Sequence, residues 1–211
     1  MIPIILDMDP GIDDAVALSI ALSNPSIDIK LLTSVAGNVS VDKTTNNLLK
    51  LTTFFHQTQI PVAKGAAAPL KKDFSDAAYI HGESGMPGYD FPQVTKEAIK
   101  LDAVTAMAEE LEASIVPMTI VATGSYTNIA MLIQKYPSLL HKIEKFVLMG
   151  GSLSGGNVSS VAEFNVFTDP DAADIVFKSG VPIVMIGLDV TLKALLPFET
   201  IDAIGSQGEA G

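Results

Sequence analysis

The stretch Asp7-Met8-Asp9-Pro10-Gly11-Ile12-Asp13-Asp14 follows directly after the apolar run Pro3 to Leu6. The apolar run predicts a buried strand, and the Pro-Gly pair predicts a turn. Asp13 and Asp14 are then expected to open a helix that extends to Ser23. The chain therefore begins with a strand, a tight turn and a helix, and four acidic side chains lie at the junction.

The same alternation continues along the chain. Further apolar runs of strand length occur at Ile29 to Val35, Met118 to Ala122, Phe146 to Met149 and Ile183 to Leu188. Segments with helical periodicity separate them at Val41 to His56, Ala98 to Ala113, Asn128 to Gln134 and Pro170 to Ser179, with Ser40 and Asp169 as expected N-caps. This order predicts an α/β fold, namely an open, mostly parallel twisted sheet with flanking helices and a Rossmann-like core. A length of 211 residues favours one domain spanning residues 1–211.

Composition narrows the classes of partner. The formal net charge of −11 repels phosphate backbones, so nucleic acid is not an expected partner. The longest apolar runs are too short to span a membrane, and no charged-then-apolar leader precedes Ile2. The absence of cysteine excludes disulfides and thiolate sites and is compatible with the cytoplasm, where we expect the protein.

Polar residues follow each expected strand. In open parallel sheets, ligands bind beyond the carboxyl ends of the strands, so these residues are the candidates for chemistry. They are Asp7 to Asp14, Gly37-Asn38, Thr123 to Asn128, Gly150-Gly151 and Asp189. The stretch from Ala66 to Gln93, which we call the flap, has no clear periodicity, and we expect it to be mobile.

The acidic stretch has an ordinary explanation and a functional one. A single Asp at a helix N-terminus commonly caps the helix. Four carboxylates within eight residues, however, raise one another's pKa unless a cation or hydrogen-bond donors compensate. Zinc would require clustered His or Cys, so a hard ion is favoured, with calcium preferred and magnesium as the competitor.

Six segments, taken in order, resemble the nucleoside hydrolase family, whose members cleave the N-glycosidic bond of ribonucleosides. The first is Asp7 to Ala15, which is similar to the family's N-terminal signature. The others are Val35-Ala36-Gly37-Asn38-Val39, His81-Gly82-Glu83-Ser84-Gly85, Thr127-Asn128-Ile129-Ala130, Asn157 through Asn165, and Gly187-Leu188-Asp189-Val190-Thr191. The flap motif, continued to Met86, most resembles the non-specific branch, which accepts purine and pyrimidine ribosides.

The resemblance implies a calcium cofactor held by Asp9, Asp14 and the main-chain carbonyl of Thr127. It also implies that Asp9 is the general base for a water molecule that calcium activates. The ribose hydroxyls would be bound by five polar residues with Met149 beneath the sugar: Asp13, Asn38, Asn157, Glu163 and Asn165. His81 is implied as a catalytic or base-contacting residue. Asp7 is expected to orient Asp9 or the turn, and Asp189 to line the site.

The resemblance also implies a ribonucleoside as the partner and a homo-oligomer, either dimer or tetramer. The family supplies, from a helix beyond the position of Gly211, a His that helps protonate the departing base and an Asp that completes the calcium shell. Our expectation is that the 211-residue polypeptide alone has little or no hydrolase activity.

Two other functions remain open at this stage. An Asp-x-Asp pair after a first strand also occurs in haloacid-dehalogenase-like phosphatases, where the first Asp, here Asp7, would be the nucleophile. Pro10-Gly11 followed by Asp13-Asp14 argues against that class. The second alternative is a ribose- or nucleoside-binding protein that retains the pocket without turnover.

Overall fold

A seven-stranded sheet forms the centre of the molecule, and its strands run in the order β4-β3-β2-β1-β5-β6-β7. A computed structural model describes residues 1–207, so residues 208–211 of the expected domain lie outside the described part. All neighbouring strands pair in parallel. The strands are β1 Ile2–Met8, β2 Ile27–Ser34, β3 Val62–Lys64, β4 Ile99–Asp102, β5 Met118–Ala122, β6 Ile143–Met149 and β7 Ile183–Ile186. The predicted fold class is confirmed.

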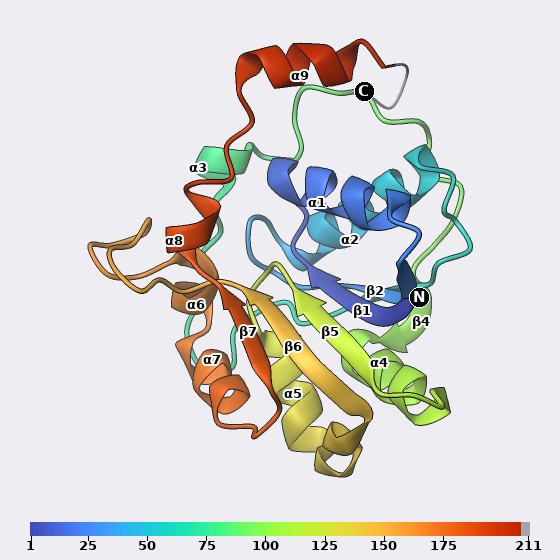
Figure 1. Cartoon of the computed structure of the whole chain (residues 1–211), viewed down its shortest axis with the longest axis vertical. Helices are drawn as coiled ribbons and strands as arrows, with labels where there is room; N and C mark the ends of the chain where they lie inside the picture. The colour runs from blue at the N-terminus through green and yellow to red at the C-terminus, as the bar shows by residue number, and fades with distance from the viewer. Residues whose placement is uncertain (208–211) are drawn as a thin grey trace.

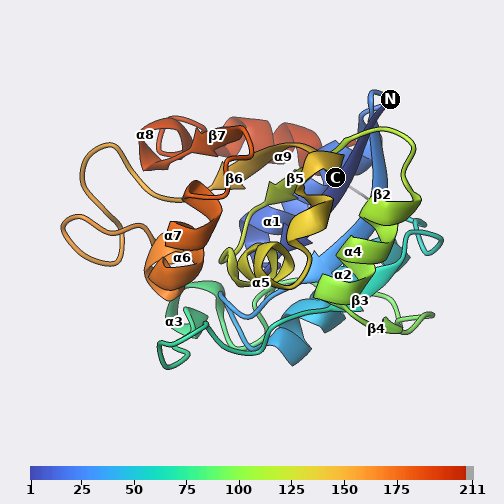
Figure 2. The same cartoon turned by 90° about the horizontal axis from the view of Figure 1, so that it is seen from below.

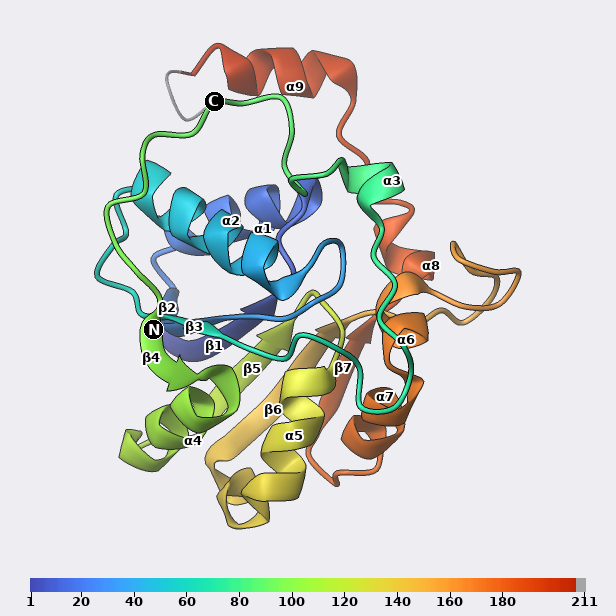
Figure 3. The same cartoon turned by 180° about the vertical axis from the view of Figure 1, so that it is seen from behind.

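Helices cover both faces of this sheet (Figure 1). The longer helices are α1 Ile12–Ser23, α2 Val41–Phe54, α4 Ala103–Ala113, α5 Thr127–Lys135, α7 Pro170–Phe177 and α9 Phe198–Gly205. The shorter ones are α3 Ala78–His81, α6 Phe164–Thr168, α8 Leu188–Thr191 and the 3-10 helix η1 Pro137–Lys142. Figure 3 shows α1 and α2 on one face and α4, α5 and α7 on the other. Figure 2 shows α5 between α4 and α7.

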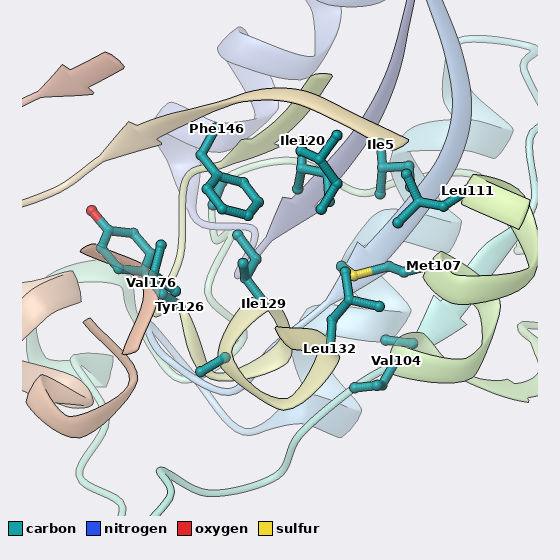
Figure 4. Packing of buried hydrophobic residues seen from close by; sticks show 14 of the residues in the cluster. Ile5, Val104, Met107, Leu111, Ile120, Tyr126, Ile129, Leu132, Phe146 and Val176 are labelled. Atoms are coloured by element: carbon teal, nitrogen blue, oxygen red, sulfur yellow. The ribbon is translucent and has the colours of Figure 1, made fainter. Parts of the chain in front are cut away.

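Side chains of β1 alternate between the two faces, and each face has its own core. Ile5 packs with the residues of α4 and α5, whereas Leu6 and Met8 pack with those of α1 and α2. Figure 4 shows the larger cluster, in which Ile120 and Phe146 lie among side chains from the helices. Because strands buried on both faces must be apolar throughout, these segments appear as continuous apolar runs.

The sheet reverses direction at β1. The chain proceeds from β1 outward to β2, β3 and β4, then returns to the other side of β1 at β5 and proceeds outward again to β7. Such a switch point opens a crevice beyond the carboxyl ends of the two central strands. Asp9 follows β1 and Thr123 follows β5, so the acidic stretch lies at this crevice.

Two expectations about the elements were wrong in detail. Residues Ile99–Asp102 were expected to begin a helix but form β4, which pairs with β3. The helix starts at Ala103 because the Asp102 carboxylate accepts hydrogen bonds from the backbone and hydroxyl of Thr105, at 3.0 and 2.7 Å. Strand β3 was not predicted, since three residues are too few to show a periodicity.

The remaining boundaries differ by a few residues. The last strand ends at Ile186, two residues before the expected end, because Leu188 begins α8. Asp169 caps α7 as expected, accepting a hydrogen bond from the backbone of Ala172 at 3.0 Å. Ser40 occupies the N-cap position of α2 without a side-chain cap bond. Within residues 1–207, no helix is both long enough and apolar enough to cross a bilayer.

We predict that Ile120→Ala lowers the free energy of unfolding by about 3 kcal/mol, because it leaves a cavity in the central strand β5. The control is Ile115→Ala, whose side chain is 97% exposed and whose replacement is expected to change stability by less than about 0.5 kcal/mol. Urea unfolding followed by circular dichroism measures both. Equal effects of the two substitutions would contradict this placement of the core.

Candidate active site

Asp9 and Asp14 form a buried pair of carboxylates at the carboxyl end of β1. The backbone of Asn38 donates a hydrogen bond to Oδ2 of Asp9 at 2.7 Å. The Asn38 side chain donates to the main-chain oxygen of Asp9 at 3.0 Å and to Oδ2 of Asp14 at 3.3 Å. Asn38, which follows β2, therefore holds both acidic residues in place.

Asp14 is also fixed from two further directions. Its Oδ2 accepts a hydrogen bond from the backbone of Gly11 at 2.9 Å, which closes the first turn of α1. Its Oδ1 accepts one from the hydroxyl of Thr123 at 2.6 Å, across the switch point between β1 and β5. The carboxylate thus joins the helix start to the neighbouring strand end.

Burial makes the charged form of both acids costly. It raises the pKa of Asp9 well above its ordinary value, and the nearby charge of Asp14 raises it further. Burial, followed by the charge of Asp13, raises the pKa of Asp14 to about 7. Oδ1 of Asp9 is buried and has no hydrogen-bond partner among the described residues. An unpaired carboxylate oxygen beside a second carboxylate fits a hard cation, which would stabilise both charges.

Two glycines allow the backbone to approach Asp9 closely. A Cβ at Gly37 would lie 1.9 Å from Oδ2 of Asp9, and one at Gly124 would lie 2.8 Å from Oδ1. No side chain larger than hydrogen fits at either position without displacing the carboxylate. The glycines that follow β2 and β5 are therefore part of the site. Both lie in stretches expected to carry chemistry, but a glycine in an ordinary turn would show the same pattern.

Asp7 connects β1 to β2 and to the start of α5. It is fully buried, and its Oδ1 accepts hydrogen bonds from the Thr33 hydroxyl at 2.6 Å and from the Asn128 amide at 2.8 Å. Burial raises its pKa to about 7 despite those two bonds. A carboxylate enclosed in this way is not placed to attack a phosphate, so the geometry does not support the phosphatase alternative.

Of the four acids expected near the first turn, Asp9, Asp13 and Asp14 lie close enough for their charges to interact, but only Asp9 and Asp14 form a buried pair. Asp13 points outward with its side chain 82% exposed, and Asp7 faces Thr33 and Asn128 instead. Within residues 1–207, no group of three or more His, Asp or Glu side chains is arranged to hold a metal ion. The described part of the chain thus offers two carboxylates, and other ligands would have to be hydroxyl or carbonyl oxygens.

Thr127 lies at the start of α5, and its hydroxyl donates to Oδ2 of Asp169 at 2.7 Å. The hydrogen bonds of residues 1–207 connect Thr123, not Thr127, to the acidic pair. The carbonyl of Thr123 faces the site as well, since it accepts a hydrogen bond from the Asn165 side chain at 2.8 Å. Thr123 lies in a stretch expected to carry chemistry but was given no role of its own, because its motif looks like part of the turn that precedes α5.

A second group of polar side chains forms a wall beyond β6. Glu163 is buried and caps α6, its Oε2 accepting hydrogen bonds from the backbone of Gly151 at 2.8 Å and of Asn165 at 3.0 Å. The Asn165 amide reaches the Sδ and the carbonyl of Met149 at 3.1 and 3.2 Å. The structure therefore brings Glu163, Asn165 and Met149 together and, through Thr123, connects them to Asp14.

Two expected site residues lie further out. Asn157 is exposed on the loop between β6 and α6, and its Oδ1 accepts a hydrogen bond from the backbone of Phe164 at 2.9 Å. Asp189 is half-buried in α8, and its nearest donor is the backbone of Leu153 at 3.5 Å. Asn157 holds its own loop closed in this structure, and no described contact joins it to Asp9.

His81 ends α3 within the flap and lies against the acidic turn. Its Nδ1 is buried, has no hydrogen-bond partner among the described residues, and is 4.0 Å from Oδ1 of Asp13. A Cβ added to Gly11 would lie 2.5 Å from that nitrogen. The flap therefore reaches the site, as its sequence suggested.

Tyr126 lies in the wall of the site, a specific position that its place in the stretch Thr123 to Asn128 did not predict. It is fully buried, and its hydroxyl donates to the carbonyl of Met149 at 3.1 Å. Gly150 leaves room for it, because a Cβ there would lie 2.2 Å from the hydroxyl. Burial and the charge of Glu163 raise the pKa of Tyr126. A tyrosine in a turn gave no signal of this role.

A cavity of about 490 Å³ borders the wall without including the acidic pair. Its lining includes Lys72, Phe167 and the outer side of Glu163. The Lys72 ammonium lies 3.2 Å from the centre of the Phe167 ring and donates to the Phe167 carbonyl at 2.8 Å. The cavity meets the candidate site at Glu163 and Gly151 but is not lined by Asp9 or Asp14, so we place the chemistry at the acids and not in this cavity.

We predict that Asn128→Ala lowers the free energy of unfolding by about 3 kcal/mol, because it leaves buried groups without partners. The amide donates to Asp7 and to the carbonyl of Ser34 at 2.9 Å, and its oxygen accepts from the backbone of Ala66 at 2.9 Å. Asn46→Ala, on the exposed side of α2, is the control and should be nearly neutral. A loss below about 1 kcal/mol for Asn128→Ala would contradict this role.

The chain matches the model of the family described as inosine-uridine preferring nucleoside hydrolase over residues 4–210. It is 49% identical over 208 residues to the non-specific ribonucleoside hydrolase RihC of Salmonella typhimurium, covering 99% of this chain and 68% of the relative. It is 46% identical over 207 residues to the pyrimidine-specific ribonucleoside hydrolase RihA of Escherichia coli, covering 98% and 67%. The solved purine-preferring ribonucleoside hydrolase from Gardnerella vaginalis superposes with a TM-score of 0.89 at 38% identity, covering 93% of this chain and 64% of that one. The chain thus spans about two thirds of the length of these relatives.

Proposed function

The chain belongs to the inosine-uridine preferring nucleoside hydrolase family, and from that membership we propose that it hydrolyses the N-glycosidic bond of ribonucleosides to ribose and free base. The observation that carries the proposal is the buried pair Asp9 and Asp14 facing the Glu163–Asn165 wall across the switch point. The reaction requires that the anomeric carbon lie between a general base, which activates water, and side chains that bind the ribose hydroxyls.

We propose calcium as the cofactor, with Asp9 and Asp14 as its carboxylate ligands. The support is the unpartnered Oδ1 of Asp9 and the raised pKa of both acids. Thr123 is a better candidate than Thr127 for a further oxygen ligand, because it already contacts Asp14. A bound divalent cation lowers the pKa of a coordinated water molecule and so supplies a nucleophile at neutral pH.

Asp9 is the residue that we propose as the general base. Its Oδ2 is occupied by the Asn38 backbone, which leaves Oδ1 to accept a proton from the attacking water molecule. The water oxygen then bonds to the anomeric carbon as the bond to the base nitrogen breaks, through an oxocarbenium-like transition state. The electron pair of the broken bond leaves with the nucleobase, which takes up one proton from solvent, and Asp9 then returns to solvent the proton that it took from the water molecule. We propose that His81 contacts the base at this step.

Ribose binding is proposed for Asp13, Asn38, Asn157, Glu163 and Asn165, with Met149 beneath the sugar. Glu163 and Asn165 are buried and fixed by backbone hydrogen bonds, so they would present a preformed wall. Buried polar groups left unpaired by a missing hydroxyl cost binding free energy, so a deoxyribonucleoside should be a much poorer substrate.

We propose that the site accepts ribonucleosides with different nucleobases. The relative at 49% identity is named non-specific and the one at 46% is named pyrimidine-specific, so identity alone does not separate them. The flap motif His81 to Met86 favours the non-specific reading, in which purine and pyrimidine ribosides are both accepted.

We also propose a homo-oligomer, supported by exposed apolar side chains on α1 and α9 such as Ile20 and Phe198. Sedimentation of the purified chain would measure its size.

For the reaction, we predict that any release of ribose from inosine and uridine by this chain, which we expect to be slow, depends on calcium, and that release from 2′-deoxyinosine is slower again by about 10³-fold or more. Asp9→Asn should reduce the rate by about 10³-fold, because an amide cannot act as the general base that takes a proton from water. The matched control Asp28→Asn changes a surface residue that pairs with Lys30 and should leave the rate unchanged. A reducing-sugar assay measures turnover, and calorimetry with ribose measures binding separately. Binding without turnover would favour the binding-protein alternative, and neither binding nor turnover would refute the proposed function.

For the cofactor, we predict that calcium at about a hundred times its dissociation constant stabilises the fold by about 2.7 kcal/mol. The physical reason is that the cation binds the two buried carboxylates only in the folded chain. Asp14→Asn should abolish most of this stabilisation, whereas Asp28→Asn should retain it. Thermal unfolding with and without calcium measures the shift. An unchanged melting temperature of the unmodified chain would contradict the calcium site.

A further inference from the structure

Asn47 is a buried polar residue that the proposed chemistry does not use. It lies within α2, is 1% exposed, and directs its amide nitrogen at two main-chain carbonyls. One is the carbonyl of Pro10 at 3.0 Å, and the other is the carbonyl of Ser84 at 2.8 Å. Pro10 belongs to the turn that carries Asp9, and Ser84 belongs to the flap. A single amide thus joins these two segments.

Gly85 shows how closely the flap approaches this amide. Its φ is +82°, in the region that favours glycine, and a Cβ there would lie 2.9 Å from the Asn47 nitrogen and 3.2 Å from the Pro10 carbonyl. Met86, the next residue, is buried in the core on the α1 and α2 face. The flap is therefore brought against the turn by Asn47 on one side and by Met86 on the other.

The position of this segment determines the position of His81. The backbone of Gly85 donates to the carbonyl of Gly82 at 3.0 Å, which closes a short turn directly after His81. The His81 ring in turn lies against Gly11. Because the chain between His81 and Ser84 is short and turned, a shift of Ser84 away from Asn47 would move the imidazole relative to the acidic turn.

We propose that Asn47 is a positioning residue that fastens flap residues 81–86 to the Pro10–Gly11 turn and so keeps His81 at the site. The effect on substrate binding that we predict below rests on the proposed ribonucleoside function. The two hydrogens of one amide nitrogen match the two carbonyls, so a side chain of similar size without donors breaks both bonds together. Asn47→Leu is such a change. Gly85→Ala breaks the same contact from the flap side.

The test measures hydrogen exchange of backbone amides on the whole chain with calcium present. Asn47→Leu and Gly85→Ala should each speed exchange of residues 81–86 by about tenfold while β1 and β5 keep their protection. Asn46→Leu, one residue away and exposed, controls for the substitution. Gly88→Ala controls for backbone strain, because Gly88 also has a positive φ, of +95°, but has no atoms within 4 Å of its Cβ position. Both controls should exchange like the unmodified chain.

Kinetics give the second readout. If the flap closes over the nucleoside, the two variants should raise the KM for inosine by about tenfold and change kcat by less than about threefold. The reason is that a smaller fraction of the molecules has the flap in the conformation that binds substrate.

Hydrogen exchange that rises equally in β1, β5 and the flap would mean that Asn47 only stabilises the fold. Unchanged exchange in the flap would overturn the proposed positioning role of Asn47. If Asn47→Leu does not fold, Gly85→Ala compared with Gly88→Ala decides. Failure of the unmodified chain to bind or cleave ribonucleosides would refute the proposed function, whereas the exchange pattern would still decide the role of Asn47.

Discussion

The burial of two carboxylates at the end of β1 is the constraint on which the rest of the structure depends. Asp9 and Asp14 repel each other and are removed from water, so their charges are costly without compensation. Compensation comes from groups that follow two other strands, namely Asn38 after β2 and Thr123 after β5. Because those groups converge only in a parallel sheet that reverses at β1, the fold and the site impose the same geometry.

A layer of polar side chains beneath the acids keeps this geometry rigid. Asp7 and Asn128 connect β1 to β2 and to the start of the flap, and their hydrogen bonds lie between the apolar core and the site. Each of these groups would be costly if left unpaired in the interior, so the network favours a single arrangement. The rigidity matters for function because a general base must be held within hydrogen-bond reach of its water molecule.

Sequence patterns predicted what is local and missed what depends on distant partners. The strand, turn and helix from Ile2 to Ser23 follow from apolar periodicity and turn residues, whereas the resemblance to the nucleoside hydrolase family singled out Asp9 and Asp14 among the four acids. Strand β4 was missed because pairing with β3 overrides the helical periodicity of its residues. Thr123 was placed among the candidates for chemistry but was given no specific role, because its importance arises from contact with Asp14, 109 positions away. The exposure of Asp13 was also unexpected, since proximity in sequence does not fix direction at a helix start.

The flap shows why a long irregular segment can still be well placed. Its early part is held by Asn128 at Ala66 and by Asp169 at Leu70, the latter at 2.8 Å. Asp169 also accepts the hydroxyl of Thr127 and caps α7, so one carboxylate ties the flap to two helices. Toward its end the flap is held by Asn47. Single buried polar side chains, together with a few apolar residues such as Met86, thus determine the path of the flap. A segment held in this way suits a part of the site that must admit substrate and then enclose it.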